Sequence, residues 1–157
     1  MTRWLTADEQ QVWRAFLGAN KLVFEQLDRE LQRDAKIPHA YYEILVRLSE
    51  APDRALRMSA LADRSQSSRS RLSHAVARLE DSGWVKRESC ADDKRGQIAR
   101  LTDDGFAALA AAAPLHVESV RKHVFDPLTA QQQQQLKAIS TALLEALQGD
   151  PDGPVCS

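Results

Sequence analysis

The chain has 157 residues, of which 43% are hydrophobic and 27% are charged, a composition typical of a folded globular protein. Its formal net charge is −1, so the total charge alone indicates no polyanionic partner. No apolar run approaches the roughly 18 residues needed to span a bilayer, and residues 1–9 lack the core of a signal peptide, so no membrane partner is expected. The two cysteines, Cys90 and Cys156, are too few for a disulfide framework and have no metal-site spacing, which predicts a cytoplasmic protein.

Charge is distributed unevenly along the sequence. Residues 54–100 contain 11 Lys and Arg against 6 Asp and Glu, a net charge of +5, whereas the remainder contains 10 against 16, a net charge of −6. Such a chain can present one positive surface to a polyanion although its total charge is close to zero. A positive surface is therefore expected within residues 54–100.

The N-terminal part of the chain predicts two helices. Thr6 and Glu9 form a capping-box pattern, and the apolar residues that follow at helical spacing predict a long helix over residues 7–33. Its apolar stripe is too wide for one small core to cover. Pro38 suits the first turn of a second helix, which is expected to end near Pro52.

Short elements follow in the middle of the chain. Ser59 is a candidate cap for a brief helix, and residues 65–68 form a polar turn. Ser68 then caps a helix predicted over residues 69–82, which Gly83 ends. Residues 84–88 and 97–101 predict two short strands, joined by a polar, charged hairpin tip.

The C-terminal part predicts two more helices and a tail. Thr102 is the expected cap of the first of these helices, and Pro114 predicts a kink or break inside it. Thr129 begins a capping-box pattern for the last helix, and residues 149–157 are expected to be a disordered tail. The fold class is therefore mainly α with a small wing of two or three strands.

The helix over residues 69–82 has the features of a DNA-recognition helix. Its buried stripe leaves short polar and basic side chains to point outward, and no acidic residue occurs between Arg64 and Leu79. Arginine can pair with guanine, serine can approach base edges closely, and helix N-terminal amides can hold a phosphate. A solvated basic face is the alternative for an isolated helix, but the preceding helix and turn and the following hairpin favour a helix-turn-helix. The predicted DNA contacts here are Ser68, Arg69, Ser70, Arg71, Ser73, His74 and Arg78.

The hairpin tip is a second candidate contact. An arginine here, such as Arg95, suits the narrow and negative minor groove, and the nearby Asp93 could orient its guanidinium. A plain charged turn is the alternative for this segment taken alone.

Several motifs together resemble the MarR family of transcriptional regulators. The motifs are Leu61-Ala62-Asp63-Arg64, residues 68–73, Arg78-Leu79-Glu80, residues 83–87, Asp93-Lys94-Arg95 and residues 101–105. The resemblance is specific over residues 58–105, and element order and length extend it over nearly the whole chain. It implies a single MarR-like domain over residues 1–157, with a winged helix-turn-helix at 37–102 between dimerisation helices at 7–36 and 103–148.

The resemblance also implies partners. Members of this family are homodimers that bind pseudopalindromic operators in double-stranded DNA, and the helix after Ser68 corresponds to their recognition helix. Asp93 and Arg95 correspond to the pair in the wing. Lys94 occupies a position where Arg is common in the family, so we expect it to keep a phosphate contact without bidentate geometry. A homodimer also accounts for the excess apolar surface of the end helices.

Three kinds of switch are considered for such a regulator. Many relatives bind phenolic or aromatic acids, and the candidate ligand-binding residues here are Trp13, Phe16, His39 and Tyr42, with ordinary packing as the alternative for each. Thiol oxidation at Cys90 is a second class, although no resolving cysteine is close in sequence. For metal sensing, His116 and His123 share a helix face but lack an i, i+4 partner, so no metal or other cofactor is expected.

Two functions remain from different classes. The first is a homodimeric repressor that a small-molecule effector releases from its operator. The second is a winged-helix adaptor that binds proteins and not DNA. The acid-free helix and the arginine of the wing favour the first. The sequence contains no nucleophile motif, carboxylate pair or phosphate loop, so no enzymatic activity is expected.

Overall fold

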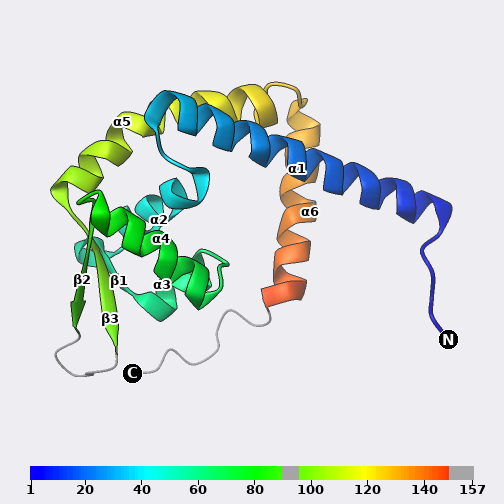
Figure 1. The fold of residues 1–157 in the computed structure, drawn as a ribbon. Helices are drawn as coiled ribbons and strands as arrows, with labels where there is room; N and C mark the ends of the chain where they lie inside the picture. The colour runs from blue at the N-terminus through cyan, green and yellow to red at the C-terminus, as the bar shows by residue number, and fades with distance from the viewer. Residues whose placement is uncertain (90–95, 149–157) are drawn as a thin grey trace. The chain divides into compact units, whose positions relative to one another are not determined.

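A computed structural model describes residues 1–89 and 96–148 (Figure 1). The chain divides between Ser119 and Val120 into two compact units. Asp93, Lys94, Arg95 and the two cysteines lie outside the described residues, as does the predicted tail. No helix in the described ranges is long and apolar enough to cross a membrane.

The first unit contains most of the helices and the sheet. Helix α1 (Ala7–Ala35) precedes α2 (His39–Ser49), and a 3-10 turn at Pro52–Arg54 leads to strand β1 (Ala55–Arg57). Helices α3 (Met58–Arg64) and α4 (Arg69–Asp81) are followed by strands β2 (Val85–Ser89) and β3 (Gln97–Leu101). Helix α5 (Asp103–Val120) then leads to the second unit.

The second unit begins with a π-helical turn over Arg121–Phe125 and continues as α6 (Ala130–Gln148). Thr129 and Gln132 form the predicted capping box before α6: the Thr129 N–H donates to Gln132 Oε1 at 2.9 Å, and the Gln132 N–H donates to Thr129 Oγ1 at 3.2 Å. The capping box of α1 is likewise confirmed, with Thr6 and Glu9 bonded reciprocally.

The three strands form an antiparallel sheet in the order β1-β3-β2. The register places Val85 opposite Leu101 and Ser89 opposite Gln97, so β2 and β3 form the predicted hairpin. β1 pairs its three residues with β3 and completes the wing. The mainly helical fold with a three-stranded wing is therefore confirmed.

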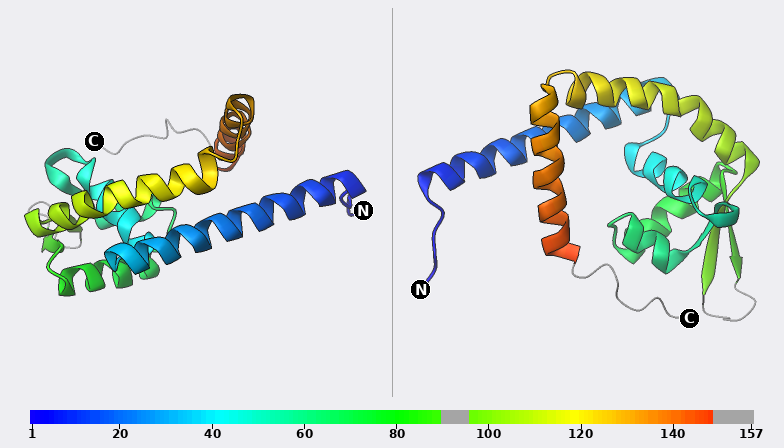
Figure 2. Two further views of the ribbon diagram at one scale, coloured as in Figure 1. Left: turned by 90° about the horizontal axis from the view of Figure 1, so that it is seen from above. Right: turned by 180° about the vertical axis from the view of Figure 1, so that it is seen from behind.

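The core of the first unit lies where α2, α3 and α4 gather beside the sheet (Figures 1 and 2). Leu45, Leu48, Leu61 and Val76 are fully buried there. Burial of one such side chain stabilises the fold by about 1.5–3 kcal/mol. This packing holds α4 in place and leaves its opposite face at the surface.

One local prediction is wrong, and another is wrong in part. Ser59 does not cap α3, which begins at Met58 after Arg57, because β1 runs directly into the helix and Arg57 already has an extended backbone. Of the kink or break predicted at Pro114, the break is absent, because helix α5 continues without interruption to Val120. Residues on both sides of the proline, among them Ala112 and Ser119, are buried, so tertiary packing holds the helix together despite the lost backbone hydrogen bond.

Gly105 marks a close approach between α5 and the turn before β2. A Cβ atom there would lie 2.1 Å from the Trp84 carbonyl oxygen. Thr102 caps the same helix end, as predicted: its Oγ1 accepts from the Gly105 N–H at 3.0 Å and donates to the Gly83 carbonyl at 2.7 Å. These contacts join α5 to the end of α4 and fix the start of the hairpin.

Candidate nucleic-acid interface

Helix α4 presents a basic, polar face to solvent. Leu72, Val76 and Leu79 are buried on its inner side, as the sequence predicts. Five of the predicted DNA contacts on this helix are exposed: Arg69, Ser70, Arg71, His74 and Arg78. Arg69 and Arg71 form no ion pair within the described part of the chain, whereas Arg78 lies 3.9 Å from Asp81. Two cations at the N-terminal end of α4 are thus available to an anionic partner.

The N-terminus of α4 is an open helix end with a side-chain cap. Ser68 Oγ accepts a hydrogen bond from the Arg71 N–H at 3.3 Å, as the N-cap prediction requires. The other amides of the first turn lack intrahelical partners, and a helix N-terminus with exposed amides favours a phosphate. This end of α4 can therefore bind the DNA backbone.

The turn between α3 and α4 sets the angle at which α4 leaves the core. The Ser67 N–H donates to the Ala62 carbonyl at 3.1 Å, which closes the end of α3. Gln66 has a left-handed backbone with a φ of 50°, which costs a residue with a Cβ atom roughly 1–2 kcal/mol. The packing of α3 on α4 compensates for this cost, and the arrangement is a helix-turn-helix.

Ser73 lies differently from the other predicted contacts. It is half-buried, and its carbonyl and hydroxyl oxygens accept from the Arg87 guanidinium at 2.9 and 3.4 Å. Arg87 Nε also lies 2.6 Å from Glu80 Oε1. Arg87 therefore connects β2 to α4 at Ser73 and at Glu80, which lie about two helical turns apart on α4. Sequence reasoning missed this role because nothing in a strand of five residues shows that its arginine turns toward a helix.

The base of the wing is held by a second arginine that the sequence did not single out. Arg100 Nε lies 3.1 Å from Glu88 Oε1 across the hairpin, and Arg100 also donates to the Asp53 carbonyl at 2.8 Å. The hydrogen bonds from Arg100 lower the pKa of Glu88, so the carboxylate stays ionised. Arg100 therefore joins β3 to β2 through Glu88 and to the turn before β1 through Asp53.

The candidate ligand-binding residues form two groups. Trp13 and Phe16 stack on each other with ring centroids 6.2 Å apart, and about half of each side chain is exposed. His39 and Tyr42 instead contact His116 of α5, at centroid distances of 5.4 and 4.5 Å. Among the described residues, no ring contact joins one group to the other. Their common role in ligand binding stays a prediction.

Comparison with known proteins places this geometry in a family. A family model described as "MarR family" matches residues 36–96, which include the helix-turn-helix. The crystal structure of Sco3205, a MarR family transcriptional regulator from Streptomyces coelicolor in complex with DNA, is similar over 96% of this chain and 94% of its own. The TM-score is 0.91, and the sequences are 55% identical. The chain belongs to the MarR family.

Further relatives of this MarR chain are also transcriptional regulators. AbsC, a MarR family transcriptional regulator from Streptomyces coelicolor, is 42% identical over 95% of this chain and 100% of its own, with a TM-score of 0.87. The transcriptional regulator HosA of Escherichia coli is 32% identical over 93 residues, which are 59% of this chain and 67% of HosA. Membership of the MarR family makes this chain a transcriptional regulator rather than an enzyme.

Proposed function

We propose that this MarR chain is a homodimeric repressor that binds a pseudopalindromic operator, with α4 in the major groove of each half-site. One observation carries the proposal: the exposed face of α4 combines arginines, serines and a histidine over a core-packed stripe, with no carboxylate between Arg64 and Leu79. This composition suits hydrogen bonding to base edges and phosphates. Sco3205, 55% identical, is known in complex with DNA, which supports the same role here.

Apolar surface on the end helices supports the homodimer. Val12, Trp13, Phe16 and Leu17 are 46–70% exposed on α1. On α6, Leu136, Ile139, Leu143, Leu144 and Leu147 are 43–83% exposed. Contiguous apolar faces of this size mark association surfaces. A two-fold dimer built on them sets two recognition helices about 34 Å apart, one turn of DNA.

We further propose that a small-molecule effector controls DNA binding. Trp13, Phe16, His39 and Tyr42 are the candidate contacts for a phenolic or aromatic acid. The supporting observation is that His39 and Tyr42 lie half-buried or buried between helices of the first unit, where aromatic rings and an imidazole can enclose an aromatic anion.

A salt-titrated mobility-shift assay with DNA from the flanks of the protein's own gene tests the DNA-binding proposal. Specific binding is expected to weaken steeply as salt rises, because phosphate contacts release counterions. Arg71→Ala is expected to cost about 1–3 kcal/mol on the preferred sequence and much less on random DNA. Arg14→Ala, an exposed arginine of α1, is the matched control and should bind as the wild type does.

Two results would contradict the proposal. Equal loss on specific and random DNA for Arg71→Ala would remove α4 from the major groove. Failure of the wild type to retard any flanking fragment would favour the protein-binding adaptor. The wing is tested in the same assay, where Arg95→Ala is expected to weaken binding to all sequences alike.

A further inference from the structure

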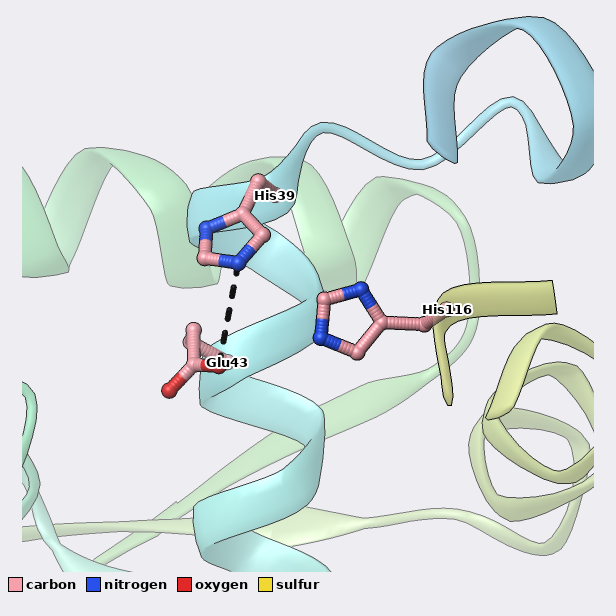
Figure 3. Close-up of side chains that lie close together, drawn as sticks. All are labelled: His39, Glu43 and His116. Carbon is pink, nitrogen blue, oxygen red and sulfur yellow. Dashed lines mark ion pairs between the residues drawn. The ribbon is translucent and has the colours of Figure 1, made fainter. Parts of the chain in front are cut away.

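Three side chains that are distant in sequence converge in the first unit. His39 and Glu43 lie one turn apart on α2, and His116 comes from the middle of α5. One nitrogen or oxygen atom from each lies within 4.8 Å of the other two, and His39 Nε2 is 3.9 Å from Glu43 Oε1. Figure 3 shows the three side chains turned toward one another. The helical spacing that paired His116 with His123 missed this cluster, because its members meet only in the tertiary structure.

Neighbouring residues from α1 and α2 hold the cluster in place. Asp28 Oδ1 accepts from the His39 N–H at 2.8 Å and caps the N-terminus of α2. The Phe24 ring meets the His39 ring edge-on at 5.7 Å, and Tyr42 lies against His116. His39 is thus positioned from both its backbone and its ring, as a ligand residue requires.

The cluster is neither sealed nor fully solvated. The side chains of His39 and Glu43 are 17% and 39% exposed, so an ion can reach them. His116 Nδ1 is buried and has no hydrogen-bond partner within the described ranges.

We propose that His39, Glu43 and His116 form a binding site for a divalent first-row transition metal ion, with Zn²⁺ the best match. Two imidazoles and one carboxylate are a donor set that zinc accepts, with water as the fourth ligand. In a tetrahedral zinc site, bonds of about 2.0–2.1 Å place neighbouring donor atoms about 3.3 Å apart. The 3.9 Å between His39 Nε2 and Glu43 Oε1, and the separations of at most 4.8 Å among all three donors, need only small side-chain rotations to reach that value.

Metal binding at this site would join α2 to α5. Because α2 packs against both α3 and α4, an ion that fixes α2 also fixes the support of the recognition helix. We infer that the ion shifts operator affinity. This consequence rests on the proposed function, whereas metal binding itself does not.

Titration of the full-length, metal-free protein with Co²⁺ tests the site, since tetrahedral Co²⁺ absorbs visible light and Zn²⁺ then displaces it. One ion per chain is expected. His116→Gln and Glu43→Gln should each weaken binding at least tenfold. His74→Gln removes an exposed imidazole on α4 by the same chemical change and should bind Co²⁺ as the wild type does.

Folding is checked separately. Thermal unfolding without metal shows whether each variant folds, and Glu43→Gln, at a partly exposed position, is the variant most certain to do so. Added Zn²⁺ is expected to raise the Tm of the wild type and of His74→Gln but not of the two site variants. No Co²⁺ binding by the wild type, or equal binding by all four proteins, would overturn the proposed site.

The link to DNA is measured by repeating the mobility shift with and without Zn²⁺. A change in operator affinity of at least tenfold is expected in the wild type and not in Glu43→Gln. If the wild type binds Zn²⁺ but its operator affinity does not change, the regulatory role of the ion is overturned and the metal site is not. Metal binding without any DNA binding would instead overturn the proposed function and leave the site standing.

Discussion

Helices α4 and α6 have the same amphipathic pattern, but the apolar side chains are buried on α4 and exposed on α6. α4 buries Leu72, Val76 and Leu79 within its own unit, with exposures of 2% or less. On α6 no residue through Leu147 is buried, and Ile139 and Leu143 are 57% and 46% exposed. The same helical periodicity therefore describes a helix packed by its own chain and one whose apolar face is open to a partner. Only the burial distinguishes the two.

The largest expected effect is on association through α6. Leu143→Asp places a carboxylate on the apolar face of both helices in the proposed dimer, which should cost at least about 3 kcal/mol of association free energy. Light scattering over a range of protein concentrations is expected to show a monomer. Gln134→Asp, on the polar side of the same helix, is the control and should stay dimeric. A wild-type protein of monomer mass at micromolar concentration would contradict the dimer.

A large effect on stability is expected in the core of the first unit. Leu48 is fully buried, so Leu48→Ala should lower the free energy of unfolding by about 2–5 kcal/mol. Urea denaturation measures the change. Gln134→Ala, at an exposed position on the polar side of α6, should change it by less than about 0.5 kcal/mol. A loss for Leu48→Ala as small as that for Gln134→Ala would contradict the burial of Leu48 in the core.

Two glycines give opposite expectations for the same substitution. Gly105→Ala should destabilise the protein by about 1–3 kcal/mol, because the new methyl group would meet the Trp84 carbonyl. Gly18→Ala lies inside α1 with nothing within 4 Å of the new atom, so it should stabilise the helix by about 0.5–1 kcal/mol. Thermal unfolding compares the two. A loss of stability for Gly18→Ala would indicate that a partner packs closely on that side of α1.

The smallest effect concerns the cap of α4. Ser68→Ala removes the acceptor for the Arg71 N–H and should cost about 1 kcal/mol of unfolding free energy. Ser68→Asp keeps an acceptor and should retain stability, but its negative charge should weaken operator binding. If Ser68→Asp binds the operator as the wild type does, the N-terminus of α4 does not lie against DNA.

Local signals in the sequence predicted the elements well. Caps and stops are local chemistry, so Thr6, Ser68 and Gly83 place the helix ends that the structure has. The strand β3 occupies residues 97–101, as predicted, because its alternating pattern lies between turn residues. The strand Ala55–Arg57 was not predicted, because three residues are too few to show an alternating pattern of apolar and polar side chains. They form a strand only by pairing with β3.

The candidate DNA face was predictable for a similar reason. An acid-free stretch between Arg64 and Leu79 is visible in the sequence, and helical spacing separates its outward side chains from the buried stripe. Ser73 is the exception: it was predicted to contact DNA, but it lies at the edge of the outward face, where a neighbouring strand packs against the helix. Arg87 of β2 donates hydrogen bonds to Ser73 there.

The sequence by itself determined the order of the helices, most of their ends, the charge segregation and the family, because capping, periodicity and motif spacing act over a few neighbouring residues. The tertiary structure alone decided that Arg87 and Arg100 brace the wing and that Pro114 does not break α5. It alone brought His116 to His39 and Glu43. The contacts of Arg100 with Glu88, of Arg87 with Ser73 and of His116 with His39 join residues 12 to 77 positions apart, and only the packing of a folded core brings such residues together.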